Sequence, residues 1–176
     1  MPLNNRTPRC ALKIRQALGG VYLILFGIGG PLQAQSASRD SLEAIGVAEA
    51  LLRAISSRDT LAAKGLLVPG AVLASIPDPV AAPGKARIQT DAAFIRTLAT
   101  GTERLLERLW SPRVILHGTL AEVHAPYDFH IDDRFSHCGT DVITVMRSDG
   151  AWRVVAVAYT VQRTGCTASP LGPPTF

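Results

Sequence analysis

Three consecutive segments near the carboxyl end of the chain constrain its fold more than any other feature. The segment from Thr119 to Ile131 alternates between apolar and polar residues, which is the two-residue period of a half-buried strand. Turn residues at Asp132-Asp133 and at Ser148-Asp149-Gly150 separate it from two further apolar runs, Phe135–Arg147 and Ala151–Arg163. These patterns predict three antiparallel strands joined as a meander.

Helical patterns are confined to the part of the chain before this meander. Apolar residues spaced three and four apart, with capping residues ahead of them, predict three helices. The expected helices cover residues 41–57, 59–67 and 90–98, and the expected shorter strands cover residues 72–76, 87–89 and 105–116. The last of these strands must bend at Ser111-Pro112. Helices first and a bent antiparallel sheet afterwards indicate an α+β fold.

Residues 1–34 have the layout of a cleavable secretory signal peptide. A basic start precedes a largely apolar, uncharged run from Ala17 to Leu32, and cleavage is expected after Ala34. An uncleaved membrane anchor is the alternative, although glycines and Pro31 interrupt the run. We expect a periplasmic or secreted protein with one folded domain over residues 35–166 and a disordered tail over residues 167–176.

The excess of positive charge belongs to the expected signal peptide. The chain has 18 Lys and Arg against 14 Asp and Glu, but the first 34 residues hold four basic and no acidic residues. The remaining chain is neutral and has no basic patch with interleaved aromatic residues, so no nucleic-acid partner is expected. No stable membrane anchor is expected after cleavage, and no cofactor signature is present in the sequence.

The histidines do not predict a metal site. His124, Asp128 and His130 share a strand face, but their spacing stretches over roughly 20 Å, which is too far for one ion.

Cys138 and Cys166 are the two cysteines of the expected mature chain. In an oxidising compartment they can form a disulfide. However, Cys138 is expected opposite Thr160 or Val161, so the chain would have to turn back near Gly165. A buried Cys138 with an unpaired Cys166 in the tail is the alternative, and the sequence leaves both open.

Four short segments of the predicted elements carry a resemblance to a known superfamily: Thr90–Ile95, Ala125–Phe129, Phe135–Gly139 and Gly150–Val154. With the order of elements, they make the region from about Ser41 to Cys166 similar to the nuclear transport factor 2-like superfamily. Within it, the chain most resembles exported bacterial proteins grouped as SnoaL-like or lumazine-binding. The resemblance implies a cystatin-like cone, in which a curved antiparallel sheet packs on the N-terminal helices around a pocket. It also implies a homodimer across the outer face of the sheet.

A cross-strand pair of His137 and Asp128 is the candidate catalytic group. If Asp132-Asp133 is a two-residue turn, Ile131 faces Arg134 and Asp128 comes opposite His137 on the polar face. A carboxylate beside an imidazole suits proton abstraction. Such pairs are also ordinary on solvated sheet surfaces, and a one-residue change in register would reverse the faces.

Four further residues are candidates for ligand binding: Tyr127, Tyr159, Asp141 and Trp152. The tyrosines can donate hydrogen bonds to a carbonyl in a pocket, although tyrosines are more often part of a core.

The final hairpin is expected to have a three-residue loop at Ser148-Asp149-Gly150. Trp152 and Val154 then face the side of Val142 and Cys138. The apolar residues left on the outer face would be covered by a homodimer, and they are Val155, Val157, Tyr159 and Val161.

These observations favour an exported protein that binds a small molecule in a pocket between curved sheet and helices. One alternative is an enzyme of isomerase, dehydratase or hydrolase type that uses the His/Asp pair. Another is a non-catalytic dimeric interaction module. Because the implied superfamily contains enzymes and binders alike, the geometry of the pocket must discriminate them.

Overall fold

The computed structural model describes residues 30–175 of the chain. Most of the predicted signal peptide, residues 1–29, lies outside the described residues. The first helix, α1 (Gly30–Ser56), begins earlier than predicted and includes Ala34, the expected cleavage position. None of the helices within residues 30–175 is long and apolar enough to cross a membrane.

Two short helices follow α1, and each starts at the capping residue that the sequence predicts. The side chain of Asp59 accepts a hydrogen bond from the Ala62 amide at 2.9 Å and caps α2 (Thr60–Leu66). The Thr90 hydroxyl accepts from the Ala93 amide at 3.3 Å and caps α3 (Asp91–Thr100).

The sheet has seven strands. Six of them follow the order β2-β1-β7-β6-β5-β3, and the seventh, β4, also pairs with β5. The strands are β1 (Leu67–Pro77), β2 (Arg87–Thr90), β3 (Leu105–Leu109), β4 (Arg113–His117), β5 (Leu120–Ile131), β6 (Arg134–Ser148) and β7 (Ala151–Val161). β1 is parallel to β7, and the other pairs are antiparallel. β3 and β4 are the predicted long strand, interrupted where Ser111 adopts a φ of 47°.

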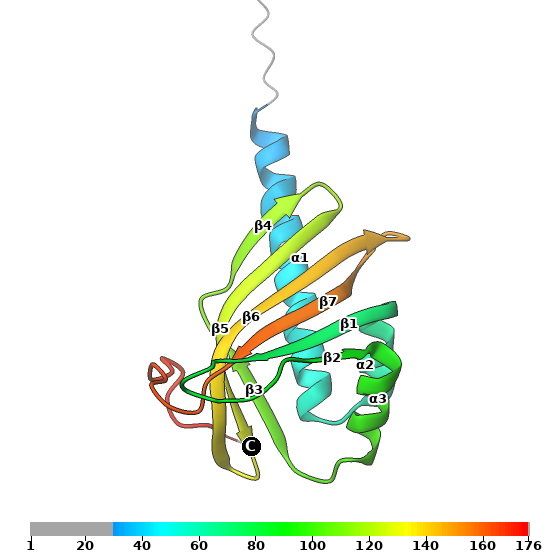
Figure 1. Ribbon diagram of the computed structural model, residues 1–176. Coiled ribbons are helices and arrows are strands. Elements are labelled where there is room, and N and C mark those ends of the chain that lie inside the picture. Colours follow the sequence, from blue (N-terminus) through cyan, green and yellow to red (C-terminus); the bar gives the residue numbers. More distant parts are fainter. Residues whose placement is uncertain (1–29, 176) are drawn as a thin grey trace, which may run out of the picture.

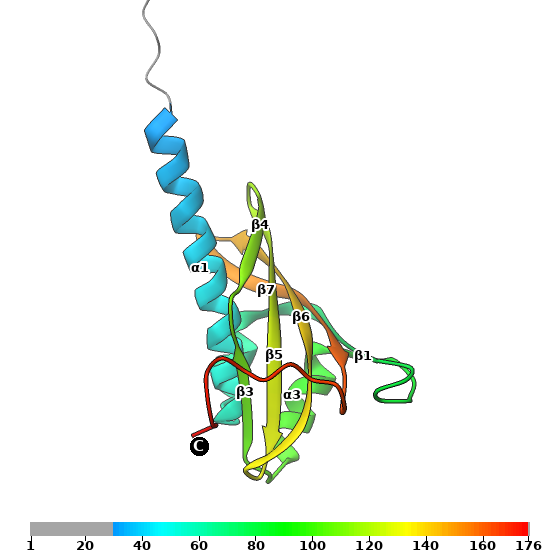
Figure 2. The same cartoon turned by 90° about the vertical axis from the view of Figure 1, so that its left-hand side faces the viewer.

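The helices cover one face of this curved sheet, as Figures 1 and 2 show. α1 contacts β3 to β7, whereas α3 contacts β1 and β2. The core between them contains apolar residues of both layers, including Ala48 and Leu51 of α1 and Val123, Ile143 and Val154 of the sheet. The α+β fold and the predicted meander are therefore confirmed.

A β-bulge in β6 changes the register that the sequence predicts. Ile131 pairs with Arg134 as expected, and His130 pairs with Phe135, but Phe129 pairs with His137. Ser136 is therefore the additional residue, and every later residue of β6 moves by one position. Asp128 comes opposite Cys138 instead of His137, so the predicted cross-strand pair is wrong.

A second bulge changes the faces of β7. The turn has two residues, Asp149 and Gly150, both with positive φ, instead of the predicted three. Val154 pairs with Val145 and Ala156 with Thr144, which leaves Val155 as the additional residue. Trp152 and Val154 therefore share the inner face with Val145, not the side of Val142 and Cys138.

The same bulge turns Val157 and Tyr159 towards the core as well. Val157 is buried in the core cluster, and Tyr159 packs against it. The predicted apolar outer face of Val155, Val157, Tyr159 and Val161 is therefore not formed. The predicted homodimer loses the residues on which it was based.

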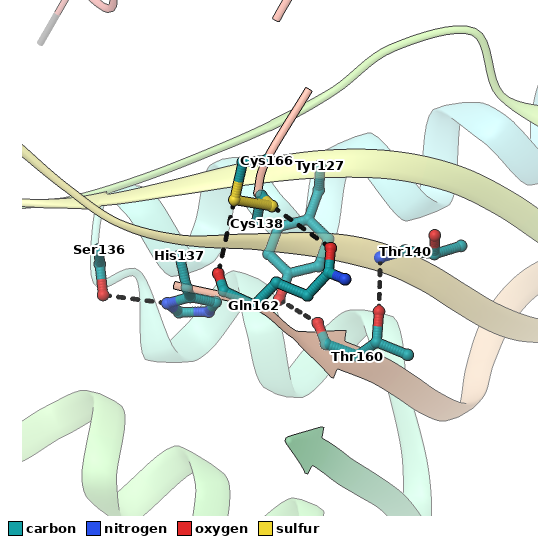
Figure 3. Close-up of a disulfide and its surroundings, with 8 residues drawn as sticks. All are labelled: Tyr127, Ser136, His137, Cys138, Thr140, Thr160, Gln162 and Cys166. Atoms are coloured by element: carbon teal, nitrogen blue, oxygen red, sulfur yellow. Dashed lines mark hydrogen bonds between the residues drawn. A yellow bond between two sulfur atoms is a disulfide. The ribbon is translucent and has the colours of Figure 1, made fainter. Parts of the chain in front are cut away.

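A disulfide between Cys138 and Cys166 joins β6 to the segment after β7 (Figure 3). Because of the two-residue turn and the bulge at Val155, Cys138 pairs with Gln162, further along than the predicted Thr160 or Val161. Gly165 adopts a φ of 72°, so the chain turns back where the sequence requires it. The Cα atoms of the two cysteines are 6.1 Å apart, which suits a disulfide.

The tail from Thr167 forms no helix or strand up to residue 175. It crosses in front of β3 and β5 in Figure 2, and the Gly172 carbonyl accepts a hydrogen bond from Arg108 at 2.9 Å.

Candidate functional site

A cavity of about 640 Å³ lies between the helices and the inner face of the sheet. Its size falls in the range of small-molecule sites. The walls are mainly apolar and come from α1, α3 and six strands; they include Leu51, Leu73, Phe94, Leu98, Phe129 and Val157.

A second hollow of about 650 Å³ lies between the end of α1 and β3. It is lined largely by charged and hydroxyl side chains and borders Thr175 of the tail. The two spaces share five lining residues: Leu52, Arg58, Glu103, Leu105 and Glu107. We take the first space as the candidate site, because its walls come from both layers and are mostly apolar.

Six polar side chains line the cavity besides its threonines and Gln89: Arg58, Arg87, Glu103, Glu107, His137 and Tyr159. Arg87 and Glu103 are exposed, which places them at the rim. Arg58 is fixed, because its guanidinium donates to the Glu103 carboxylate at 2.8 Å and to the Leu98 carbonyl at 3.1 Å. Glu107, His137 and Tyr159 are half-buried and form the polar part of the interior.

Glu107 lies in the middle of β3 and faces the cavity from the sheet. It pairs with Phe129, which in turn pairs with His137, so the three side chains lie in one row across three strands. Burial raises the pKa of Glu107 well above its ordinary value, and the charges of Asp141 and Asp128 raise it further. An enclosed carboxyl of this kind holds its proton more firmly than a free glutamate does.

Asp141 lies next to this row on the inner face, opposite Tyr159. Only 1% of it is exposed, and within residues 30–175 neither carboxyl oxygen has a hydrogen-bond partner. Burial raises the pKa of Asp141 to about 7. Asp141 is therefore a deep acidic group behind the cavity wall.

His137 is packed between aromatic rings. Its ring centroid lies 5.0 Å from that of Phe129 and 5.7 Å from that of Tyr127, and its Nδ1 is 3.0 Å from the Ser136 hydroxyl (Figure 3). Burial, together with the smaller effect of the charge of Arg163, lowers the pKa of His137 to about 4. The imidazole is therefore neutral near pH 7.

Tyr127 serves the sheet instead of the cavity. Its side chain is fully buried, and its hydroxyl donates to the Thr160 carbonyl at 2.7 Å, across β6 (Figure 3). That carbonyl is available because the Thr140 amide donates to the Thr160 hydroxyl at 2.9 Å. A Cβ at Gly139 would collide with the Thr160 carbonyl, so the close approach requires glycine.

Asp128 and Trp152 also lie away from the cavity. Asp128 accepts two hydrogen bonds from Arg108, at 2.8 and 2.5 Å, on the outer side of the sheet. The guanidinium carbon of Arg147 lies over the Trp152 ring, 5.0 Å from the ring centroid. The same guanidinium forms salt bridges with Asp40 and Glu43 of α1. Both residues therefore connect parts of the fold.

Of the six residues predicted for the site, His137 and Tyr159 line the cavity. Asp141 and Tyr127 lie behind its wall, and Asp128 and Trp152 contribute no lining. The sequence reasoning missed Glu107, although Leu105, Glu107 and Leu109 alternate with the strand period and so share a face. Within residues 30–175, no cluster of His, Cys, Asp or Glu could hold a metal ion.

No family model and no curated protein matches the sequence. Solved structures are similar to the fold at low identity. A protein of unknown function from Mycobacterium tuberculosis is 14% identical, with a TM-score of 0.61, over 79% of this chain and 80% of that one. A proposed dehydratase of the nuclear transport factor 2-like family from Streptomyces avermitilis is 13% identical, with a TM-score of 0.58, over 71% of this chain and 97% of that one.

A third similar structure is the beta subunit of a proposed aromatic-ring-hydroxylating dioxygenase from Novosphingobium aromaticivorans. It is 14% identical, with a TM-score of 0.60, over 80% of this chain and 99% of that one. Further similar structures are described as nuclear transport factor 2-like or cystatin-like. The chain therefore has a nuclear transport factor 2-like fold, as its sequence resemblance implies.

Proposed function

We propose that this protein is exported and binds a small molecule in the cavity between α1, α3 and the inner face of the sheet. The cavity itself carries this proposal, because it combines about 640 Å³ of space with mostly apolar walls and few polar groups. Apolar walls provide affinity, and the polar groups at Glu107, His137 and Tyr159 provide orientation.

Two features support export. The first 34 residues have a basic start, an apolar run and a small-residue cleavage sequence. The disulfide between Cys138 and Cys166 is of a kind that persists in oxidising compartments. The mass of the mature protein is expected to correspond to a start at Gln35.

Acid-base catalysis of the isomerase, dehydratase or hydrolase type is the second candidate function. One observation favours it: Glu107 lines the cavity, and its pKa is raised well above its ordinary value by burial and by Asp141. A carboxyl with a raised pKa is suited to deliver or accept a proton in a reaction. In this reading Glu107 takes the role that the sequence assigned to Asp128.

A thermal-shift screen of small amphipathic compounds tests the binding proposal. Compounds that bind are expected to raise the melting temperature of the wild type but not that of Val157→Phe, whose larger side chain occupies the cavity. Val80→Phe is the matched control, because Val80 is 88% exposed in a loop. A screen without binders, or with equal shifts for Val157→Phe, would contradict the proposal.

A further inference from the structure

In the described part of the chain, Glu107 in the wall of the cavity and Asp141 behind that wall have no compensating cation. Within residues 30–175, no arginine, lysine or histidine forms a salt bridge with Glu107 or Asp141. Both oxygens of Asp141 also lack a hydrogen-bond partner in that range, although the residue is only 1% exposed. Buried carboxyl groups are rarely left unpaired, because each unpaired group costs desolvation free energy.

The cations near the cavity are committed elsewhere. Arg58 is held at the rim by Glu103 and by the Leu98 carbonyl. Arg108 neighbours Glu107 in sequence, but its guanidinium binds Asp128 on the opposite face of the sheet. Arg87 is exposed at the rim. None of these three side chains neutralises the inner end of the cavity.

We propose that the ligand of this cavity is a small amine with an apolar body, and that Glu107 receives its ammonium group with Asp141 behind it. This inference rests on the proposed function, since it assigns a ligand class to the same cavity. An ammonium group supplies the donors and the positive charge that the two carboxyls lack. The Phe129 ring beside Glu107 adds a face that attracts cations.

Binding of an amine is coupled to a proton. The titratable and charged groups around Glu107 come from every neighbouring element. They are Asp141 and His137 on β6, Tyr127 and Asp128 on β5, Tyr159 on β7, Arg87 on β2, Glu49 and Arg53 on α1, and Arg58, Glu103 and Arg104 in the loops. His137 is neutral near pH 7, and burial raises the pKa of both tyrosines, so these three do not change charge there. Because the pKa of both carboxyls is raised, an ammonium group that binds beside them favours their ionised form, and binding releases a proton.

Calorimetric titration with two probes of the same shape tests the inference. Naphthylmethylamine carries an ammonium group at neutral pH, whereas naphthylmethanol is uncharged. We expect the amine to bind the wild type about tenfold more tightly than the alcohol. Glu107→Gln is expected to lower the affinity for the amine about tenfold and to change the affinity for the alcohol less than about twofold.

Glu122→Gln is the matched control, because Glu122 lies on the outer face of β5, and both affinities are expected to stay unchanged. Titrations of the wild type in two buffers of different ionisation enthalpy should show proton release with the amine alone, which needs no variant to fold. Equal binding of both probes, or no effect of Glu107→Gln on the amine, would overturn the inference and leave the binding function standing. Failure of both probes to bind would count against both.

Discussion

The hydroxyl of Tyr127 shows how a buried phenol can support a sheet without lining the cavity. Its hydrogen bond to the Thr160 carbonyl joins β5 to β7 across the intervening strand. Tyr127→Phe leaves that carbonyl without its donor and is expected to lower the free energy of unfolding by about 1 to 2 kcal/mol. Chemical denaturation measures the loss.

Probe binding separates this structural role from a role in the site. Tyr127→Phe should leave the affinity for naphthylmethanol unchanged, because Tyr127 does not line the cavity. Tyr159→Phe is the comparison, since Tyr159 does line it. Weaker binding with unchanged stability in Tyr127→Phe would show that the hydroxyl belongs to the site.

Asp141 gives the stability of the protein a distinctive pH dependence. Its pKa is raised to about 7 by burial, so the folded state holds the proton more firmly than the unfolded state does. The protonated carboxyl makes its full contribution to the free energy of unfolding at pH values below the ordinary carboxyl pKa. This contribution is lost as pH rises towards about 7. Asp141→Asn cannot lose a proton and should gain about 1 to 3 kcal/mol relative to wild type between about pH 5 and pH 8.

Thermal or chemical denaturation across this range measures the relative gain. The pKa of His137 is lowered to about 4, so the contribution of its neutral ring to stability is lost as pH falls from about 6.5 towards 4. This pH dependence is opposite to that of Asp141. Because both proteins contain His137, that contribution cancels in the comparison. Parallel stability curves for the two proteins would show that Asp141 is not an enclosed carboxyl.

The sequence predicted the faces of β5 correctly, residue by residue, because strict alternation leaves one assignment. It could not place His137, since the bulge at Ser136 moves a histidine from one face to the other without altering the local pattern. Glu107 was within reach of the same reasoning, because it alternates with Leu105 and Leu109. A charged residue on an apolar face is a stronger pointer to a pocket than a histidine on a polar face.

At the scale of elements, local chemistry determined most of what could be predicted. Asp59 and Thr90 cap the helices that follow them, and Ser111-Pro112 interrupts the edge strand. The bulges at Ser136 and Val155 were not predictable, because they depend on packing between strands and helices distant in sequence. Two such shifts change which residues of β6 and β7 face the cavity.

The disulfide should stabilise the end of the sheet near the tail. Cys138 and Cys166 are separated by 28 residues, and their bond restricts the unfolded chain over that length. The double variant Cys138→Ala/Cys166→Ser is expected to lose about 2 to 4 kcal/mol of stability. Denaturation with and without a reducing agent provides the measurement.

The double variant is also the control for the reducing agent, which should destabilise the wild type alone. Equal stability of the wild type with and without reducing agent would contradict the stabilising role of the bond.

At the scale of the whole molecule, we propose a homodimer across the outer face of the sheet. This face carries small or apolar side chains of β1, β6 and β7, among them Val72, Ala74, Val142, Ala156 and Ala158. Val142→Arg is expected to weaken association by several kcal/mol, because it buries an unpaired charge in the interface. Light scattering at micromolar concentration measures the oligomeric state.

Val80→Arg adds the same charge in an exposed loop and should leave the dimer intact. A wild-type protein that is monomeric under these conditions would rule out the dimer.

The binding cavity is the central claim, and it depends on the whole assembly of helices over the curved sheet. The most direct measurement is mass spectrometry of small molecules released on denaturation of protein isolated from its natural host. The account predicts one compound, close to stoichiometric with the wild type, that carries an amine and is absent from Val157→Phe. Identical profiles from the two proteins, with no enriched compound, would contradict it.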